Sequence, residues 1–94
     1  MNAAPPALRT GSPRFALNHA IYDLTRHPDA RRIAADKARF LAEYPLSAEE
    51  REALLHLQWR KLEDLGVLPN LLYRYYALHG LPPETFPDAL AGRT

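Results

Sequence analysis

The segment GVLPNLLYRYYALHG (residues 66–80) constrains the fold more than any other part of the chain. Pro69 and Gly80 supply a helix start and a helix stop. Between Leu71 and His79 the only permanently charged residue is Arg74. Two apolar stripes run along this helix, formed by Leu71, Tyr75 and Leu78 and by Leu72, Tyr76 and His79. A helix that is apolar on nearly every side is normally surrounded by other protein.

The rest of the chain offers little material to surround such a helix. The sequence has 94 residues, which is the size of one small domain. A domain of this size buries only about 60% of the surface that its unfolded chain exposes. We therefore expect a second chain or domain to cover part of the side that carries Tyr73 and Tyr76. In the simpler alternative, Leu71, Tyr75 and Leu78 form the core and the other tyrosines are half-exposed.

Start and stop signals predict three further helices. Ser12 and Pro13 are typical of an N-cap and a first helical position, for a helix over 14–26. The pair His27-Pro28 separates it from a second helix over 28–43. A capping box, SAEE at 47–50, starts a third helix that extends to Gly66, with a bend near Trp59 left open.

These elements predict an all-α fold, a compact bundle of four or five short helices with disordered or extended tails at both ends. The helical domain is expected over residues 13–80. Residues 1–12 are rich in Ala, Pro, Gly and Ser/Thr and are predicted to be a flexible tail. Residues 81–94 contain three prolines in their first seven positions, so we expect this tail to be largely non-helical.

The first helix has more apolar surface than one core contact requires. Its helical spacing places one apolar set on one face and a second set on the opposite side. The first set is Leu17, Ala20, Ile21 and Leu24. The second is Phe15, His19 and Tyr22. One of these stripes faces the core, and the other is surplus.

Residue types that support independent catalysis are missing or have a structural explanation. The chain has no cysteine, which excludes disulfides, a thiolate zinc site and a cysteine nucleophile. Metal-ligand spacing is also missing among the four histidines, His19, His27, His56 and His79. Ser12 and Ser47 are better explained as helix caps. We therefore predict no catalytic, cofactor-binding or metal-binding residue in this chain.

Charge and hydropathy exclude two other classes of partner. The chain has 12 basic and 11 acidic residues and a net charge of +1, which offers no electrostatic match to nucleic acid or to an anionic membrane. No apolar run approaches the roughly 20 residues of a membrane span. The N-terminal residues lack the apolar core of a signal peptide. We expect a cytoplasmic protein with no nucleic-acid or membrane partner.

Several segments occur in an order typical of one protein family. They are DLTRHPDARRIAADKAR (residues 23–39), FLAEYPLSAEEREAL (40–54), LEDLGVLP (62–69) and the aromatic helix that follows. In this order and spacing, over roughly two thirds of the chain, the sequence resembles the LigA-type small (alpha) subunit of protocatechuate 4,5-dioxygenase-like extradiol dioxygenases.

The resemblance implies a non-catalytic small subunit or lid module. In that family the small subunit packs on a larger LigB-type chain, which carries non-haem Fe(II) and cleaves a catecholic ring next to its hydroxyls. The resemblance also implies that the start of the apolar helix faces the partner's cavity and that the surplus stripe of the first helix docks too. The partner-binding residues expected on this basis are Leu68, Pro69, Asn70, Tyr73, Phe15, His19 and Tyr22. Tyr76 is added to them because it lies on the side of the apolar helix that we expect a partner to cover.

Other functions remain open at this point. The family's helical module is also similar to the recognition domain of borosin-type peptide precursors, which bind a methyltransferase. The chain would then be a stand-alone protein-interaction module, with residues 81–94 as the modified peptide. Self-association through the tyrosine face and an autonomous enzyme are further alternatives.

Overall fold

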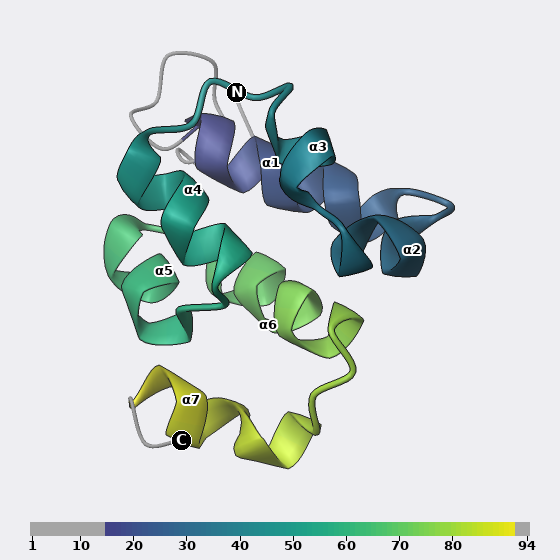
Figure 1. Cartoon of the computed structure of the whole chain (residues 1–94). Coiled ribbons are helices and arrows are strands. Elements are labelled where there is room, and N and C mark those ends of the chain that lie inside the picture. The colour runs from purple at the N-terminus through teal and green to yellow at the C-terminus, as the bar shows by residue number, and fades with distance from the viewer. Residues whose placement is uncertain (1–14, 92–94) are drawn as a thin grey trace, which may run out of the picture.

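The computed structural model describes residues 15–91, and every regular element in this range is a helix (Figure 1). The all-α fold class expected from the sequence is confirmed. The tail predicted over 1–12 and the cap predicted at Ser12 and Pro13 lie outside the described residues. In chain order the elements are α1 (Phe15–Arg26), α2 (Ala30–Ala35), α3 (Ala38–Leu41), α4 (Ala48–Leu55), α5 (Trp59–Leu65), α6 (Pro69–Leu78), the 3-10 helix η2 (Pro83–Thr85) and α7 (Phe86–Leu90).

Two of the expected helices are each divided in two. The helix expected over 28–43 becomes α2 and α3, because Asp36 leaves the helical backbone conformation with φ −142° and ψ 68°. The helix expected from Ser47 to Gly66 becomes α4 and α5. Its division lies just before Trp59, where the sequence left a bend open. The capping box is present: the Ser47 hydroxyl accepts from the Glu50 N–H at 3.1 Å, and the Glu50 carboxylate accepts from the Ser47 N–H at 2.9 Å.

The stop between α4 and α5 is made by a leucine in the left-handed conformation. Leu57 has φ 53°, and the N–H of Gln58 donates to the carbonyl oxygen of Ala53 at 3.0 Å. This bond is typical of the helix ending in which glycine usually takes the left-handed position. Gly66, with φ 108°, ends α5 in the same way. The left-handed conformation costs a residue with a side chain about 1–2 kcal/mol. Leucine is therefore rare at such a position, and a leucine in the sequence does not predict a helix end.

Helix α6 packs against α1, α5 and α2, which lie around it in the view of Figure 1. Four of its residues are buried: Leu71, Leu72, Tyr75 and Tyr76. The Tyr75 side chain is 0% exposed, and its hydroxyl donates to the carbonyl oxygen of Leu54 in α4 at 2.8 Å. The helix that is apolar on nearly every side is therefore surrounded largely by its own chain.

A buried asparagine fixes the loop between α5 and α6 onto α1. Asn18 lies on α1 among the core leucines and is 0% exposed. Its amide nitrogen donates to the carbonyl oxygen of Gly66 at 3.1 Å, and its amide oxygen accepts from the N–H of Leu68 at 2.9 Å. The two bonds join residues 48 and 50 positions apart in sequence. They therefore hold the first turn of α6 in a fixed place on α1.

The C-terminal segment differs from its expected conformation. Residues 83–90 were expected to be largely non-helical, but they form η2 and α7. Pro83 and Pro87 stand in the first turns of these two helices, where the missing N–H of proline breaks no hydrogen bond. We call residues 81–91 the C-terminal arm. It lies across the bottom of the molecule in Figure 1, and α7 packs against α5.

The Asn18 bonds predict a large loss of stability on substitution. Asn18→Leu keeps a side chain of similar size but leaves the Gly66 carbonyl and the Leu68 N–H without this partner. We expect a decrease of about 1–3 kcal/mol in the free energy of unfolding, because two partly buried backbone groups lose this partner. Urea denaturation followed by circular dichroism measures it. The control Asn70→Leu, at an exposed position, should change stability by less than about 0.5 kcal/mol; equal effects of the two variants would contradict this role.

Candidate partner-binding surface

Four of the expected partner-binding residues form one edge at the start of α6. Pro69 and Asn70 are exposed, Leu68 is half-buried, and Tyr73 follows one helical turn later. Tyr73 is 40% exposed and is the large hydrophobic side chain that stands out as exposed among the described residues. We call these four residues the docking edge. Its position depends on Asn18, which binds the backbone of Leu68 directly.

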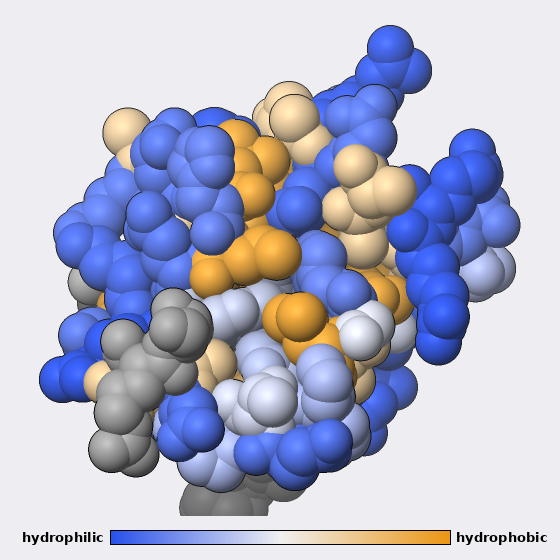
Figure 2. Space-filling model, turned by 60° about the horizontal axis from the view of Figure 1, so that its bottom comes forward, coloured by the Kyte–Doolittle hydropathy of each residue, from blue (hydrophilic) through white to orange (hydrophobic). Residues whose placement is uncertain are grey.

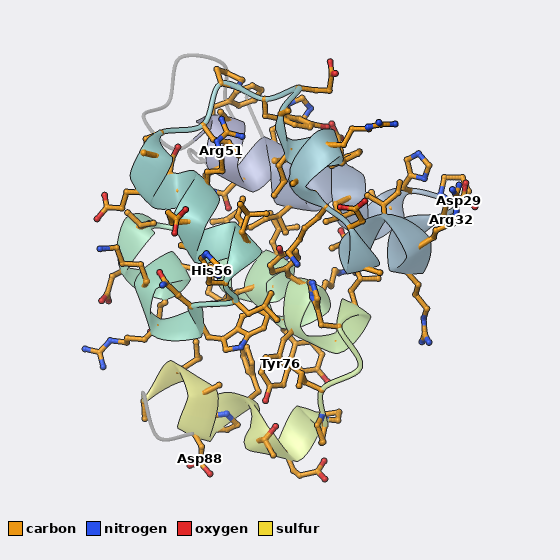
Figure 3. The ribbon with its side chains drawn as sticks, viewed as in Figure 1. Asp29, Arg32, Arg51, His56, Tyr76 and Asp88 are labelled. Carbon is orange, nitrogen blue, oxygen red and sulfur yellow. The ribbon has the colours of Figure 1, made fainter. Side chains whose placement is uncertain are left out.

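Tyr76 is not part of that edge. The sequence placed it on a face covered by a partner, but it is only 3% exposed within this chain. Its ring contacts Trp59 at 4.9 Å and Phe86 at 5.0 Å between centroids, and its hydroxyl is hydrogen-bonded to the hydroxyl of Thr85. Figure 3 shows Tyr76 between α6 and the C-terminal arm. Within this chain the arm folds back and covers Tyr76, and its role in binding a partner stays a prediction.

Tyr73 is the point where the docking edge meets the arm. Its ring packs edge-on against Phe86, with centroids 5.3 Å apart. Phe86 is half-buried and touches Tyr73 on one side and Tyr76 on the other. A chain that binds at Tyr73 would therefore lie next to the arm as well.

The surplus stripe of α1 lies against the segment after α3. Phe15 stacks on His19 at 5.0 Å, and His19 contacts the ring of Tyr44 at 5.6 Å. Asp23 accepts the Tyr44 hydroxyl at 2.6 Å and lies 3.1 Å from Nε2 of His19. Burial, together with this bond to Asp23, raises the pKa of the Tyr44 hydroxyl. Part of the predicted surplus is therefore used inside the chain.

Tyr22, the third member of that stripe, has a different environment. It is half-buried, and the guanidinium of Arg26 lies 4.3 Å from the centre of its ring. This cation–π contact leaves the ring partly accessible. Phe15, His19 and Tyr22 all remain half-exposed, so docking through this stripe stays a prediction.

His79 combines a buried ring nitrogen with a lowered pKa. Its Nδ1 bonds to the carbonyl oxygen of Tyr75 at 2.8 Å, and its ring contacts Tyr75 at 4.6 Å and Trp59 at 6.2 Å. Its Nε2 is buried and, among residues 15–91, has no hydrogen-bond partner. Burial lowers the pKa of His79 below its ordinary value of 6.5; the bond to Tyr75 opposes this shift and the charge of Lys37 adds to it. The fold therefore favours the neutral imidazole.

Residues 15–91 contain neither a cluster of metal ligands nor a membrane-spanning helix. No group of three or more His, Cys, Asp or Glu side chains in this range could hold a metal ion. No helix there is long and apolar enough to cross a membrane. The sequence-based expectation that this chain holds no cofactor stays a prediction.

Comparison with protein families gives the chain's identity at the level of the family. The family model described as "Aromatic-ring-opening dioxygenase LigAB, LigA subunit" matches residues 17–94. The chain belongs to the LigA family. The resemblance inferred from sequence segments is thereby confirmed, and the match extends beyond residue 80 to include the C-terminal arm. No curated protein and no solved structure matches this LigA-family chain.

Two residues that shape the docking edge of this LigA-family chain were missed from sequence. Around the axis of α1, Asn18 falls between Ile21 and Tyr22, and a lone polar residue among apolar ones is a signal for a buried hydrogen-bonding group. Phe86 lies among prolines, and these led to the prediction that the segment around it is non-helical. In both cases the decisive contact joins residues far apart in the sequence or in separate helices.

The buried imidazole predicts a pH dependence of stability. Between the lowered folded pKa of His79 and its ordinary value of 6.5, the unfolded chain binds more protons than the folded chain. The free energy of unfolding should therefore be full above that ordinary value and fall as the pH drops through this window. His79→Phe keeps an aromatic ring and removes the titration, so the dependence of stability on pH below 6.5 should become weaker.

The measurement is urea denaturation at a series of pH values. The matched control is His56→Gln, because His56 is exposed on α4's C-terminal end and pairs only at the surface with Glu52. The control should keep the pH dependence of the native chain. An unchanged dependence in His79→Phe would mean that His79 is not the responsible group.

Proposed function

We propose that this chain is the small, non-catalytic subunit of an extradiol aromatic-ring-cleaving dioxygenase. In this proposal it packs on a LigB-type partner that carries the non-haem Fe(II), and the complex acts in cytoplasmic catabolism of aromatic compounds. The observation that carries the proposal is the LigA family match over residues 17–94. Oxygenases of this type hold their iron with two histidines and one carboxylate. Residues 15–91 contain no group of three such side chains that could hold a metal, so the proposal assigns the iron to the partner.

The docking edge is the part of the chain best suited to meet that partner. A tyrosine can bury its ring while its hydroxyl finds a polar group, which is why tyrosine is frequent at protein interfaces. Tyr73 has this accessibility. Pro69 and Asn70 extend the same edge with a rigid and a polar residue, and both are exposed. The edge is held on a fixed backbone by Asn18, so little ordering is needed on binding.

Purification from the native host tests the assignment. The tagged full-length chain is recovered, and the proteins that accompany it are identified by mass spectrometry and assayed for iron. We expect a LigB-type chain that contains iron and opens a catecholic ring only when both chains are present. Recovery of the chain alone, or turnover by the LigB-type chain at the same rate without it, would contradict the proposal.

The docking edge makes a specific prediction about affinity. Tyr73→Glu places a charge on the surface that the partner would bury, so we expect the affinity for the LigB-type chain to fall at least about tenfold. Because Tyr73 is exposed, the isolated variant should remain folded. Isothermal titration calorimetry measures the affinity. The control Arg32→Glu changes an exposed residue of α2, which pairs with Asp29 at the surface, and should leave the affinity within about twofold.

A substitution at Tyr76 distinguishes an effect on stability from an effect on partner affinity. Tyr76→Glu would place a charge in the buried contact with Trp59 and Phe86, so its first effect should be on the stability of the isolated chain. A loss of affinity in a stable Tyr73→Glu protein therefore reports on the interface, whereas a loss in Tyr76→Glu does not. Wild-type affinity in Tyr73→Glu would show that the docking edge is wrongly assigned.

The C-terminal arm counts against the peptide-precursor alternative. A modified peptide must enter the active site of the modifying enzyme, but residues 83–90 are helical and Ala89 is only 5% exposed against the body of this chain. Phe86 is likewise held between two tyrosines of α6. This alternative would require the arm to leave its place before each modification.

A further inference from the structure

The C-terminal arm keeps its backbone hydrogen bonds to itself. Within the described residues, the N–H of Thr85 donates to the carbonyl oxygen of Pro82 at 3.0 Å, and the N–H of Ala91 donates to that of Pro87 at 3.1 Å. The Thr85 hydroxyl also donates to the Pro82 carbonyl, at 2.7 Å. These bonds do not depend on the body of the molecule. The arm can therefore keep its local structure on any surface that packs against its apolar side chains in the same way.

Side chains provide the attachment of the arm to the body. Phe86 packs against Tyr73 and Tyr76, and the hydroxyls of Thr85 and Tyr76 are hydrogen-bonded. Ala89 is buried against α5. We call the receiving surface, formed by Tyr73, Tyr76, Trp59 and the side of α5 next to Ala89, the arm groove. Figure 2 shows the face that carries the arm, where apolar surface gathers near the middle with polar residues around it.

The link from α6 to η2, residues 79–82, is short and contains one glycine, Gly80. Gly80 has φ 77°, and a side chain added there would meet no atom within 4 Å. Glycine adopts positive and negative φ about equally well. Pro82 follows in an extended conformation, with φ −64° and ψ 132°, and its ring keeps that segment stiff. A change at Gly80 can therefore redirect the whole arm while its internal structure is preserved.

We propose that the arm is exchangeable and that the partner which fits the arm groove is a second copy of this chain. In the exchanged dimer, each arm occupies the groove of the other copy. The groove already holds Phe86, Ala89 and the hydroxyl of Thr85, and every copy carries that segment. Exchange preserves each contact between arm and groove, and changes only the link and the number of chains.

Protein concentration decides between the folded-back and the exchanged arm. A short link gives the arm an effective concentration on the order of millimolar at its own groove. The monomer is therefore favoured in dilute solution, and the dimer fraction rises as the protein approaches that concentration. This inference goes beyond the proposed function and requires no LigB-type chain, so its failure would leave the proposed function untouched.

Deletion of Gly80 and Leu81 from the full-length chain tests the exchange, because it keeps the Pro82 carbonyl to which Thr85 donates. The deletion shortens the link by about 7 Å, so that an arm no longer reaches the groove of its own copy. We expect this variant to be a dimer by light scattering at concentrations where the native chain is a monomer. Adding Phe86→Asp to the deletion should restore the monomer, whereas adding Glu84→Ala, at an exposed position of the arm, should leave the dimer intact. A folded but monomeric deletion variant would overturn the proposal.

An isotope-filtered NMR experiment identifies which surface holds the dimer. Samples are mixed from labelled and unlabelled chains, after partial unfolding and refolding, and contacts between Phe86 and the rings of Tyr73 and Tyr76 are recorded. Intermolecular contacts are expected in the deletion variant and in the native chain at about 1 mM. Contacts that remain intramolecular in both samples would overturn the proposal, and the native sample gives this answer even if the deletion variant does not fold.

Discussion

The bonds of one buried amide, Asn18, determine where the central helix of this protein begins. Asn18 is enclosed by core leucines, and it uses both its donor and its acceptor on the backbone around Gly66 and Leu68. An amide in such a place is tolerated only because its polar atoms are paired. These two bonds fix the start of α6 against α1. The docking edge, which starts at Leu68, is positioned by the same two bonds.

Trp59 is the centre of an aromatic cluster to which two tyrosines of α6 contribute. Its ring contacts Tyr75 at 5.6 Å and Tyr76 at 4.9 Å, both in edge-to-face geometry, and Phe86 continues the cluster onto the arm. Aromatic side chains bury much area each, which helps a short chain to form a core. The left-handed Leu57 turns the chain so that Trp59 begins α5 facing this cluster. The steric cost of Leu57 is thus offset by the position it gives to Trp59.

The sequence predicted those parts of the fold that depend on local signals. The capping box at Ser47, the stop at Gly66 and the proline start at Pro69 were found because each acts within one helical turn. The sequence left open whether the helix is interrupted near Trp59, because leucine at position 57 does not predict a helix end. Tyr76 was assigned to a partner because its position on an apolar stripe of the helix indicates only that the side chain is covered. The stripe does not indicate which chain covers it. The docking edge was predicted from family resemblance, while its support by Asn18 depends on a contact across 50 positions.

The arm groove and the docking edge share one side chain, and this restricts how arm exchange and partner binding can influence each other. Tyr73 belongs to the edge, yet its ring rests on Phe86 of the arm. The folded-back monomer and the exchanged dimer both keep that contact, so a partner that binds Tyr73 beside Phe86 does not distinguish between them. A partner that replaced Phe86 on Tyr73 would instead compete with both forms and release the arm. Because a ligand shifts an equilibrium only through its different affinity for the two states, subunit binding and arm exchange are independent as long as Phe86 stays in place.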